Sequence, residues 1–512
     1  MKARQLPQLA RLALALPAHL RHPITPEQAA TRLGRQLANR HENFLTVARR
    51  MIYENPVSPY RRLLAWAGCD FADLRQSVQA HGLDRTLERL HAAGVHLTLE
   101  EFKLQTPIRR PGLTLEPRET DFDSPLLAGD GIAGTTSGSR ARVTRVLYDW
   151  EFIAEEAAHE AVLYAHHGVL DAPLALWYPA PPGVAGVHNL LMNLKLGRPP
   201  AKWFSQIDPV TSPMPGWHRW ALRGIRWSGR TAGLNVPRPE FADLAQADTV
   251  LDWLRQSGTG VLRTFASSAV RLAQRARERG IDLRGATIFT GGEPLTEARR
   301  RFIESAGANV FPRYVATEPG LIAAACARRA RSDDMHVYVD RIAVIQGPER
   351  LLFTTLSPHA GKVLLNVDLG DAGELTTRPC DCEFGRLGFD VHVARVSSQQ
   401  RLTVEGMTVL ASELEAILNA IIAPAGGSPD SYQCRQTPDE RGLSRLVIAV
   451  SPDVGNLDEQ SFVESVYQGL RARGPGLAVA AAIWKQAGAI QVVREQPRLS
   501  RGCKLSPLAR AP

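Results

Sequence analysis

Residues 280–315, GIDLRGATIFTGGEPLTEARRRFIESAGANVFPRYV, constrain the fold more than any other stretch of the chain. The apolar run 286–290 is typical of a buried strand, and a Gly-Gly turn follows it. Residues 294–307 have helical spacing, and 308–315 form a second apolar run. A strand, a helix and a strand in this order predict a βαβ unit, which belongs to a layered α/β domain.

The rest of the chain divides around this unit. Its 512 residues exceed what one core organises, so two or three domains are expected. Residues 1–120 are predicted to be mostly helical, with a Thr/Glu capping pattern before PEQAATRLGRQLA and a helical run, 73–94, that ends at Gly94. Residues 121–395 are predicted to form a large α/β domain. Residues 396–512 alternate strand and helix patterns, which predicts a small α+β lid domain.

Composition excludes several classes of protein. Hydrophobic residues make up 44% and charged residues 22%, as in ordinary globular proteins. The net charge is +9, but arginines alternate with acids and no run of five like charges occurs, so no nucleic-acid partner is predicted. The six cysteines are too sparse for a disulfide framework, which favours a reducing cytoplasm.

The N-terminal stretch MKARQLPQLARLALALPAHL has some features of a signal peptide. Arg11 interrupts its apolar run, and no clear cleavage site follows, so an amphipathic surface helix is predicted instead. No stretch approaches the roughly 20 apolar residues of a membrane span, so stable membrane insertion is not expected.

The stretch GTTSGSRARVTRVLYD, residues 134–149, concentrates glycine, hydroxyl and arginine residues before a predicted helix. Small residues let successive backbone N–H groups point into one concavity that binds an anion, and hydroxyls and arginines add donors. A plain surface loop is the alternative. Asp149 is the predicted N-cap of the following helix and Gly168 its C-cap.

Four short motifs occur in an order that resembles the adenylate-forming superfamily. They are Thr136-Ser137-Gly138-Ser139, Gly291-Gly292-Glu293-Pro294, Tyr314-Val315-Ala316-Thr317-Glu318 and Gly370-Asp371. The resemblance covers residues 100–504 approximately. Within this superfamily, the chain most resembles the phenylacetate–coenzyme A ligases. Four features suggest that branch: the helical N-terminus, GGEPLTEARRRFIE, HVYVDRIAVI and PCDCEFGR. Such enzymes activate a carboxylate with ATP, giving an acyl-adenylate and pyrophosphate.

This resemblance implies the nucleotide-binding residues. Loop 135–142, with Arg142 in place of the usual lysine, would hold the β- and γ-phosphates. The GGEP backbone would approach adenine and ribose, because glycine has no side chain in the way. Tyr314 would flank the adenine, Asp371 would accept from the ribose hydroxyls, and Arg395 would orient the nucleotide or the lid. Tyr314 as an ordinary strand aromatic and Asp371 as a turn residue are the alternatives.

The resemblance also implies the catalytic residues. Thr317 would donate to the α-phosphate, and Glu318 would bind Mg²⁺, a hard cation that prefers oxygen ligands. Lys504, in RGCKLSP near the chain end, would stabilise charge that develops on the carboxylate and α-phosphate. A basic tail without a catalytic role is the alternative for Lys504, and a solvated acid is the alternative for Glu318.

Cys326, His336, Cys380 and Cys382 have the ligand types of a structural Cys3His zinc site. Some proteins that resemble phenylacetate–coenzyme A ligases carry such a set. Reduced buried cysteines beside a surface histidine are the alternative, because C-x-C is less typical of zinc sites than C-x2-C.

The carboxylate pocket is predicted only by position, beside helix 150–168, with His188, Trp203 and Phe204 as candidates. The two aromatic residues are more often core residues, and the pair His166-His167 suits C-terminal capping better than catalysis.

Several positions depart from the family pattern. The phosphate loop reads Arg140-Ala141-Arg142-Val143 where Thr-Gly-x-Pro is usual, and Val315 stands where glycine is usual. Before Gly-Asp, the sequence has Asn366-Val367-Asp368 in place of Arg-Tyr-Arg. VSSQQ lacks the hinge aspartate, and near the C-terminus Cys503 separates Gly502 from Lys504. These changes indicate a divergent member.

The sequence therefore predicts an AMP-forming carboxylate ligase that uses ATP and Mg²⁺, acts on a small carboxylic acid and transfers the acyl group to coenzyme A. Transfer to a carrier-protein thiol or an amine is the first alternative. A non-catalytic nucleotide-binding or scaffold protein on the same fold, or a nucleotidyl transferase, are the others. A homodimer is compatible with this prediction.

Overall fold

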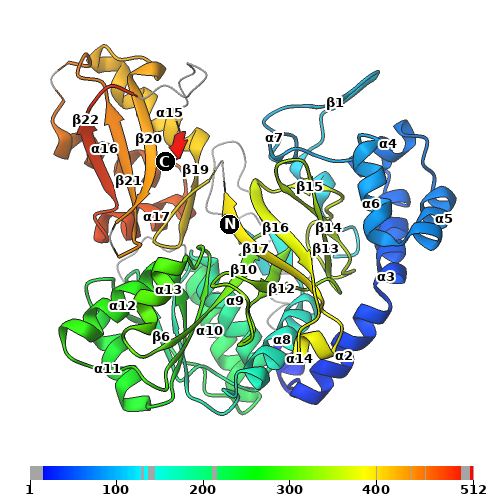
Figure 1. The fold of residues 1–512 in the computed structure, drawn as a ribbon, viewed down its shortest axis with the longest axis horizontal. Helices are drawn as coiled ribbons and strands as arrows, with labels where there is room; N and C mark the ends of the chain where they lie inside the picture. The colour runs from blue at the N-terminus through cyan, green and yellow to red at the C-terminus, as the bar shows by residue number, and fades with distance from the viewer. Residues whose placement is uncertain are drawn as a thin grey trace.

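The structure is a computed structural model that describes residues 15–127, 132–135, 145–209, 216–398, 401–439, 441–455, 457–497 and 508–510. In Figure 1 the C-terminal unit (orange to red) and the N-terminal helical segment (blue) stand at opposite sides of a large central domain. None of the described helices has the length and apolar character that a membrane crossing needs.

The N-terminal segment is helical, as predicted. Thr25 caps the first complete helix through a capping box whose partner is Gln28, the residue after the expected glutamate. The predicted helical run 73–94 is two helices, because Gly82 takes a φ of +79° between them. The helices are α2 Pro26–Ala38, α3 Arg40–Val47, the π-helical η2 Ala48–Tyr53, α4 Pro59–Trp66, α5 Phe71–His81, α6 Leu83–Ala92 and α7 Leu99–Phe102.

A ten-stranded sheet organises the large domain, in the order β16-β17-β12-β11-β10-β9-β8-β5-β6-β7. The six neighbouring strands β7, β6, β5, β8, β9 and β10 pair parallel. From β10 onward, through β11, β12, β17 and β16, each strand pairs antiparallel with the next. The strands are β5 Leu174–Trp177, β6 Lys202–Ser205, β7 Pro239–Phe241, β8 Val261–Phe265, β9 Thr287–Gly291, β10 Asn309–Ala316, β11 Gly320–Ala324, β12 Met335–Val337, β16 Asp371–Thr377 and β17 Val391–Ser398.

The predicted βαβ unit is β9, α13 and β10, and β9 pairs parallel with β10. Helix α8 begins at the predicted cap, where Asp149 accepts a hydrogen bond from the Phe152 amide at 2.6 Å. The helices of the large domain are α8 Trp150–His166, α9 Val184–Lys195, α10 Gly216–Thr231, α11 Ala247–Ser257, α12 Ala266–Glu278, α13 Glu297–Glu304 and α14 Glu383–Arg386.

Smaller elements cover the edges of this domain. They are β1 Ile108–Arg110 with β2 Leu113–Leu115, the 3-10 turn η3 Glu119–Phe122, β3 Ile132–Thr135 with β4 Arg145–Tyr148, and the sheet of β13 Ile342–Gln346, β14 Leu351–Thr355 and β15 Val367–Asp368.

The C-terminal unit is α+β, as predicted, and it contains elements that the sequence did not reveal. The unpredicted ones are β19 Met407–Leu410, η4 Ala423–Ala425, η5 Pro429–Ser431, β20 Tyr432–Pro438, α17 Pro475–Gln486 and β23 Leu508–Arg510. The predicted ones are β18 Arg401–Val404, α15 Ala411–Ile422, β21 Ser444–Val450, α16 Glu459–Arg471 and β22 Ile490–Arg494.

Polar contacts hold the C-terminal unit against the large domain. Arg271 forms an ion pair with Glu405 at 2.7 Å, and the Arg299 guanidinium donates to the Gly442 carbonyl at 2.6 Å. The apolar core is continuous across this boundary, because residues of β8, α12 and α17 belong to one cluster. The two parts therefore present one joint surface at the carboxyl ends of β8 to β10.

Candidate active site

A cavity of about 330 Å³ lies where the carboxyl ends of the parallel strands meet the C-terminal unit. In open α/β sheets this edge is the usual place for ligands. The central strands contribute the turn after β9 and the end of β10, and the C-terminal unit contributes Thr403, Gly406, Met407, Thr408, Leu410, Gly476 and Val479.

The GGEP turn forms one wall of this cavity, with Gly291, Gly292, Glu293 and Pro294 all lining it. Gly292 has a φ of +76°, and an added Cβ would lie 3.1 Å from the Phe265 ring. The buried Glu293 carboxylate accepts a hydrogen bond from the Ser267 amide at 2.7 Å, at the start of α12. Glycine therefore allows the close approach, and Glu293 anchors the turn to the domain.

Tyr314 and Asp371 meet at the opposite wall. The Tyr314 hydroxyl donates to the Asp371 carboxylate at 2.6 Å, and both residues are buried and line the cavity. They come from strands that are not neighbours in the sheet, β10 and the start of β16, with β11, β12 and β17 between them. The sequence predicted both as nucleotide ligands but not the hydrogen bond between them.

Thr317 and Glu318 lie in the turn from β10 to β11 and also line the cavity. Glu318 is only 2% exposed and forms an ion pair with the Nζ atom of Lys103, which follows α7. Lys103 was not among the predicted site residues, because it lies 215 positions from Glu318 in the chain and belongs to no recognisable motif.

A network of buried charges supports the cavity from α8. The Glu156 carboxylate accepts hydrogen bonds from His188 Nε2 at 2.5 Å, the Leu321 amide at 2.6 Å and Arg341 Nη1 at 2.8 Å. Burial alone would raise its pKa, but His188 and Arg341 together with the hydrogen bonds lower the pKa of Glu156 to about 2. An added Cβ on Gly320 would lie 2.2 Å from this carboxylate.

A second buried acid on the same helix binds two arginines. Glu160 pairs with Arg263 through both carboxylate oxygens, at 3.0 and 3.1 Å, and with Arg313, which lines the cavity. These groups carry one more positive than negative charge. Losing any one partner of the α8 network would be costly, because it would leave a buried charge unpaired.

Of the predicted carboxylate-pocket residues, the structure brings only His188 to the cavity. Trp203 is fully buried in β6 and donates to the Tyr178 carbonyl at 3.0 Å, and Phe204 belongs to the core. His166 and His167 end α8 and contact the 325–327 backbone rather than the cavity.

The structure does not bring Arg395 into the cavity. Arg395 has a φ of +54° in β17, and its exposed side chain forms an ion pair with Glu374 on β16. The following residues of β17, Val396, Ser397 and Ser398, line the cavity instead. The phosphate-loop residues Thr136, Ser137, Gly138, Ser139 and Arg142, and the predicted catalytic Lys504, lie outside the described residues.

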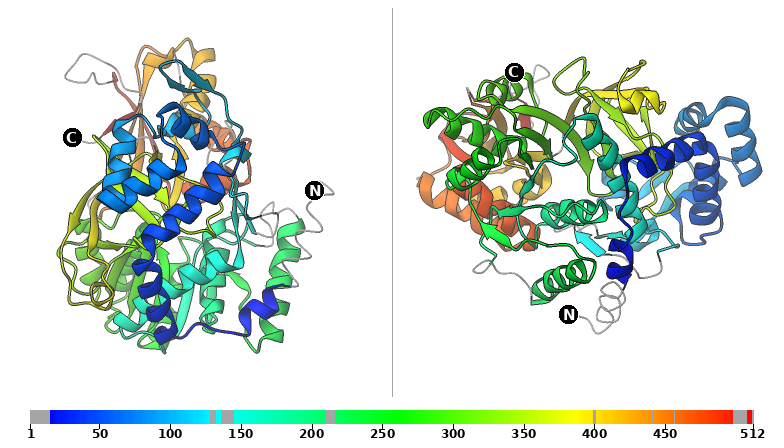
Figure 2. Two further views of the ribbon diagram at one scale, coloured as in Figure 1. Left: turned by 90° about the vertical axis from the view of Figure 1, so that its right-hand side faces the viewer. Right: turned by 90° about the horizontal axis from the view of Figure 1, so that it is seen from below.

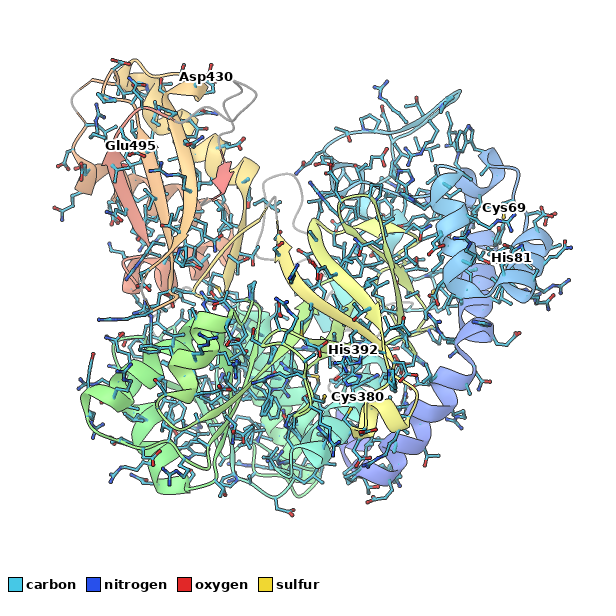
Figure 3. All side chains as sticks on the ribbon, viewed as in Figure 1. Cys69, His81, Cys380, His392, Asp430 and Glu495 are labelled. Atoms are coloured by element: carbon cyan, nitrogen blue, oxygen red, sulfur yellow. The ribbon has the colours of Figure 1, made fainter. Side chains whose placement is uncertain are left out.

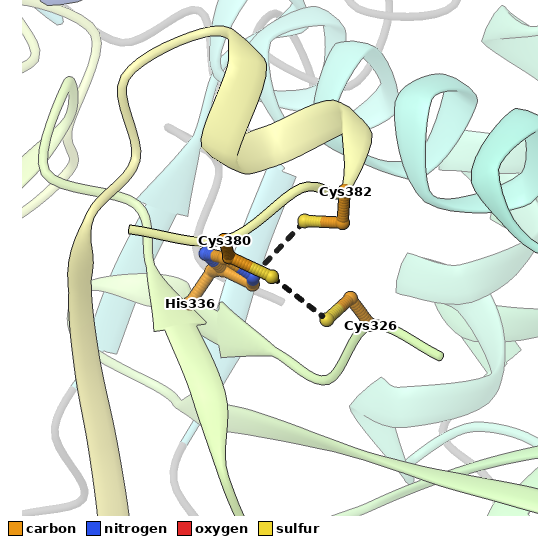
Figure 4. A group of neighbouring side chains, drawn as sticks. All are labelled: Cys326, His336, Cys380 and Cys382. Carbon is orange, nitrogen blue, oxygen red and sulfur yellow. Dashed lines mark hydrogen bonds between the residues drawn. The ribbon is translucent and has the colours of Figure 1, made fainter. Parts of the chain in front are cut away.

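The predicted Cys3His group assembles around β12, with His336 in the strand and the three cysteines in loops, and none of the four residues lines the cavity (Figure 4). The four ligand atoms of Cys326, His336, Cys380 and Cys382 lie within 4.8 Å of one another. Cys326 and Cys380 sulfurs are 3.8 Å apart, and Cys382 Sγ is 3.1 Å from His336 Nε2. Figure 3 shows Cys380 at the same corner of the large domain as His392, whose ring is 4.1 Å from that of His336.

The surroundings of this cluster suit a tetrahedral metal ion. The sulfur separation matches the edge of a tetrahedron with Zn–S bonds of about 2.3 Å. The His336 Nδ1 atom contacts the Phe389 carbonyl at 2.7 Å, which fixes the ring with Nε2 toward the sulfurs. Gly385 approaches so closely that an added Cβ would lie 1.8 Å from the Cys380 carbonyl oxygen. The donor set and spacing therefore fit zinc.

No protein-family model matches the chain, and no curated protein matches it. Among solved structures, 2-hydroxyisobutyryl-CoA ligase in complex with 2-HIB-AMP and CoA is 15% identical, with a TM-score of 0.54 over 96% of this chain and 91% of that chain. The amide bond synthetase McbA from Marinactinospora thermotolerans is 15% identical, with a TM-score of 0.45 over 88% of this chain and 92% of that chain. The first likeness shows that this chain has the fold of the adenylate-forming ligases, as its motifs predicted.

Proposed function

We propose that this protein activates a carboxylic acid with ATP to an acyl-adenylate and transfers the acyl group to a thiol, with coenzyme A as the acceptor. The observation that carries the proposal is the meeting of GGEP, Tyr314–Glu318 and Asp371 in one cavity. These segments are far apart in the sequence, and the resemblance assigns all of them to the same nucleotide. The 2-hydroxyisobutyryl-CoA ligase that shares the fold was solved in complex with 2-HIB-AMP and CoA, which agrees with this chemistry.

The polar groups of the cavity divide the work of adenylation. Asp371, oriented by the Tyr314 hydroxyl, accepts from ribose hydroxyls, and the GGEP backbone faces the base and ribose. Glu318 is the carboxylate that would hold Mg²⁺, which neutralises phosphate charge when bound. Lys103 neutralises the same buried carboxylate in its present geometry. The phosphate loop and Lys504 complete the proposed site on residues outside those described.

The α9 wall is the proposed acid-binding end. Val184, Ala185 and Met192 make it mainly apolar, and His188 provides a polar group. Because Glu156 accepts from His188 Nε2, the imidazole has a fixed orientation at the wall. This arrangement supports an acid with an apolar body.

We also propose that the Cys3His group binds a structural Zn²⁺. His336 lies in β12 and the three cysteines lie in loops, so the metal would tie the 326 loop and the 380–382 turn to this strand. A four-ligand closed site leaves no position for a substrate, and the site is separate from the residues that line the cavity.

The test is carboxylate-dependent exchange of labelled pyrophosphate into ATP, over a panel of aryl and aliphatic acids. We expect exchange with one class of acid and its loss in Lys504→Ala, with Lys485→Ala as the matched control. Lys485 is an exposed lysine of α17 that pairs with Glu464. Exchange unchanged in Lys504→Ala, or absent with every acid in a folded protein that binds ATP, would contradict the proposal.

The acceptor is tested separately with the acid that supports exchange. Coenzyme A should give an acyl-thioester and AMP in stoichiometric amounts. Normal exchange without a coenzyme A product, but with an acylated carrier protein or amide, would replace the thiol acceptor and leave the adenylation step intact.

A further inference from the structure

Helix α10, GWHRWALRGIRWSGRT, carries arginine and tryptophan and contains no acidic residue. The face of this helix that packs against the domain carries apolar residues and a glycine. Ile225 is buried, and Leu222 packs against the core. At Gly229 the helix lies so close to Val236 that an added Cβ would be 2.2 Å from its methyl group. The helix is therefore fixed to the domain, and its other face points outward.

The outer face gathers the charged and aromatic residues. Trp220 is 70% exposed and Trp227 is 59% exposed, and Arg219, Arg223 and Arg230 are exposed beside them. At about 100° per residue these positions lie within an arc of roughly 120° along the helix. We call these five residues the α10 patch.

Among the described residues, no ion pair with an acidic side chain is found for the arginines of the patch, and both indoles are exposed. Of the four exposed large hydrophobic side chains among the described residues, two are these indoles. The Arg223 guanidinium lies 5.1 Å from the Trp220 ring centre. On the same helix, burial and the charges of Arg238 and Arg230 lower the pKa of Arg226. Cations this close together favour an anionic surface from outside.

A short N-terminal helical segment lies beside α10. Both views of Figure 2 place the helical residues 15–20 next to this helix, and Leu16, Leu20 and Ile225 share one apolar cluster. Its described residues, 15–22, contain the exposed Arg21 and no acidic residue. This segment therefore adds no negative charge beside the helix.

We propose that the α10 patch is a peripheral docking surface for an anionic phospholipid bilayer. Indole rings prefer the headgroup region, where one edge is apolar and the other is hydrated. Arginine places its stem along the apolar layer and its guanidinium among the phosphates. A helix of 16 residues, fixed by its inner face, lies flat along such a surface for about 24 Å. An acidic protein would need acidic groups matched to single arginines, whereas a bilayer fits a continuous stripe of mixed indole and guanidinium.

The experiment is co-sedimentation of the full chain with vesicles of phosphatidylcholine alone or with about one third phosphatidylglycerol. We expect binding only to the anionic vesicles, and its loss in high salt. Each arginine near such a surface contributes about a fivefold gain in binding, so Arg223→Gln with Arg230→Gln should lower the partition coefficient about 25-fold.

The matched control is Arg61→Gln with Arg62→Gln, which removes the same charge from the exposed side of α4 at another side of the molecule. It should change binding less than about twofold. Trp220→Ala with Trp227→Ala should weaken binding even in low salt, since the indoles contribute apolar contact. Failure of the native chain to sediment with anionic vesicles would overturn the proposal, and so would equal losses in the patch and control variants.

Discussion

The Cys3His group gives the sharpest prediction, because two of its ligand–ligand separations can be compared directly with those of a tetrahedral zinc site. Zn–S bonds of about 2.3 Å and a Zn–N bond of about 2.05 Å require S···S edges of roughly 3.8 Å and S···N edges of roughly 3.5 Å. The Cys326–Cys380 separation is 3.8 Å, and the Cys382–His336 separation is 3.1 Å. The first of these two edges already matches, and the second would lengthen by about 0.4 Å when zinc binds.

The perturbation is Cys382→Ser, which removes a buried ligand and keeps the side-chain volume. We expect the purified wild-type chain to contain about one zinc per chain, and the variant almost none. A site filled to about a thousand times its Kd contributes about 4 kcal/mol to the free energy of unfolding. In a chain of this size the entropy of unfolding is about 1 kcal/mol/K, so the loss would lower Tm by roughly 4 °C.

The assay combines zinc content by atomic spectroscopy with thermal unfolding before and after chelation. Cys69→Ser is the matched control, because Cys69 is also a free thiol but lies in the N-terminal helical segment (Figure 3). The control should keep its zinc. Wild-type protein that holds no zinc and gains no stability from added zinc would refute the reasoning, as would equal loss in the control.

Three further predictions concern the cavity and its support. Tyr314→Phe should raise the KM for ATP about tenfold in pyrophosphate exchange with little change in Tm, because it removes one charge-assisted hydrogen bond at the ribose end; an unchanged KM would argue against that role. Asp149 raises the pKa of His359 by hydrogen bonding, so the pair stabilises the fold below pH 6.5 and the effect is lost as the pH rises through the raised value. In urea unfolding, His359→Gln should therefore lower the free energy of unfolding by about 0.5 kcal/mol at pH 5.5 and leave it unchanged at pH 8.5. An equal loss at both pH values would contradict the expected pH dependence. Gly320 has a positive φ, and an added Cβ would lie 2.2 Å from a buried carboxylate, so Gly320→Ala should lower the free energy of unfolding by about 3 kcal/mol. Gly68→Ala, where φ is also positive but nothing lies within 4 Å of the added Cβ, should lower it by only about 1 kcal/mol.

Local patterns in the sequence were enough to predict the central βαβ unit and the motifs around it. Strand period, the Gly-Gly turn and helical spacing are properties of neighbouring residues, so they can be read without the fold. The convergence of GGEP, Glu318 and Asp371 was predicted only through the resemblance. Two of the elements missed in the C-terminal unit, β20 and α17, have mixed or uniformly apolar patterns that carry no clear period.

The pairing of buried charges could not be predicted from the sequence. Lys103 reaches Glu318 across 215 positions, and Glu156 brings together His188, the Leu321 amide and Arg341. Each of these residues alone has the pattern of an ordinary surface charge or a core histidine. Their partners became evident only when packing excluded water and made pairing obligatory.

The sequence by itself determined the order of elements, the glycine turns, and the residue types available for nucleotide and metal binding, because these depend on local backbone preference and side-chain chemistry. Only the tertiary structure decided which of them meet. It paired Tyr314 with Asp371, brought four metal-ligand atoms within 4.8 Å, and turned Arg395 out to Glu374. Distance and desolvation act between residues remote in sequence, so the folded packing, rather than the order of the residues, selects the groups that work together.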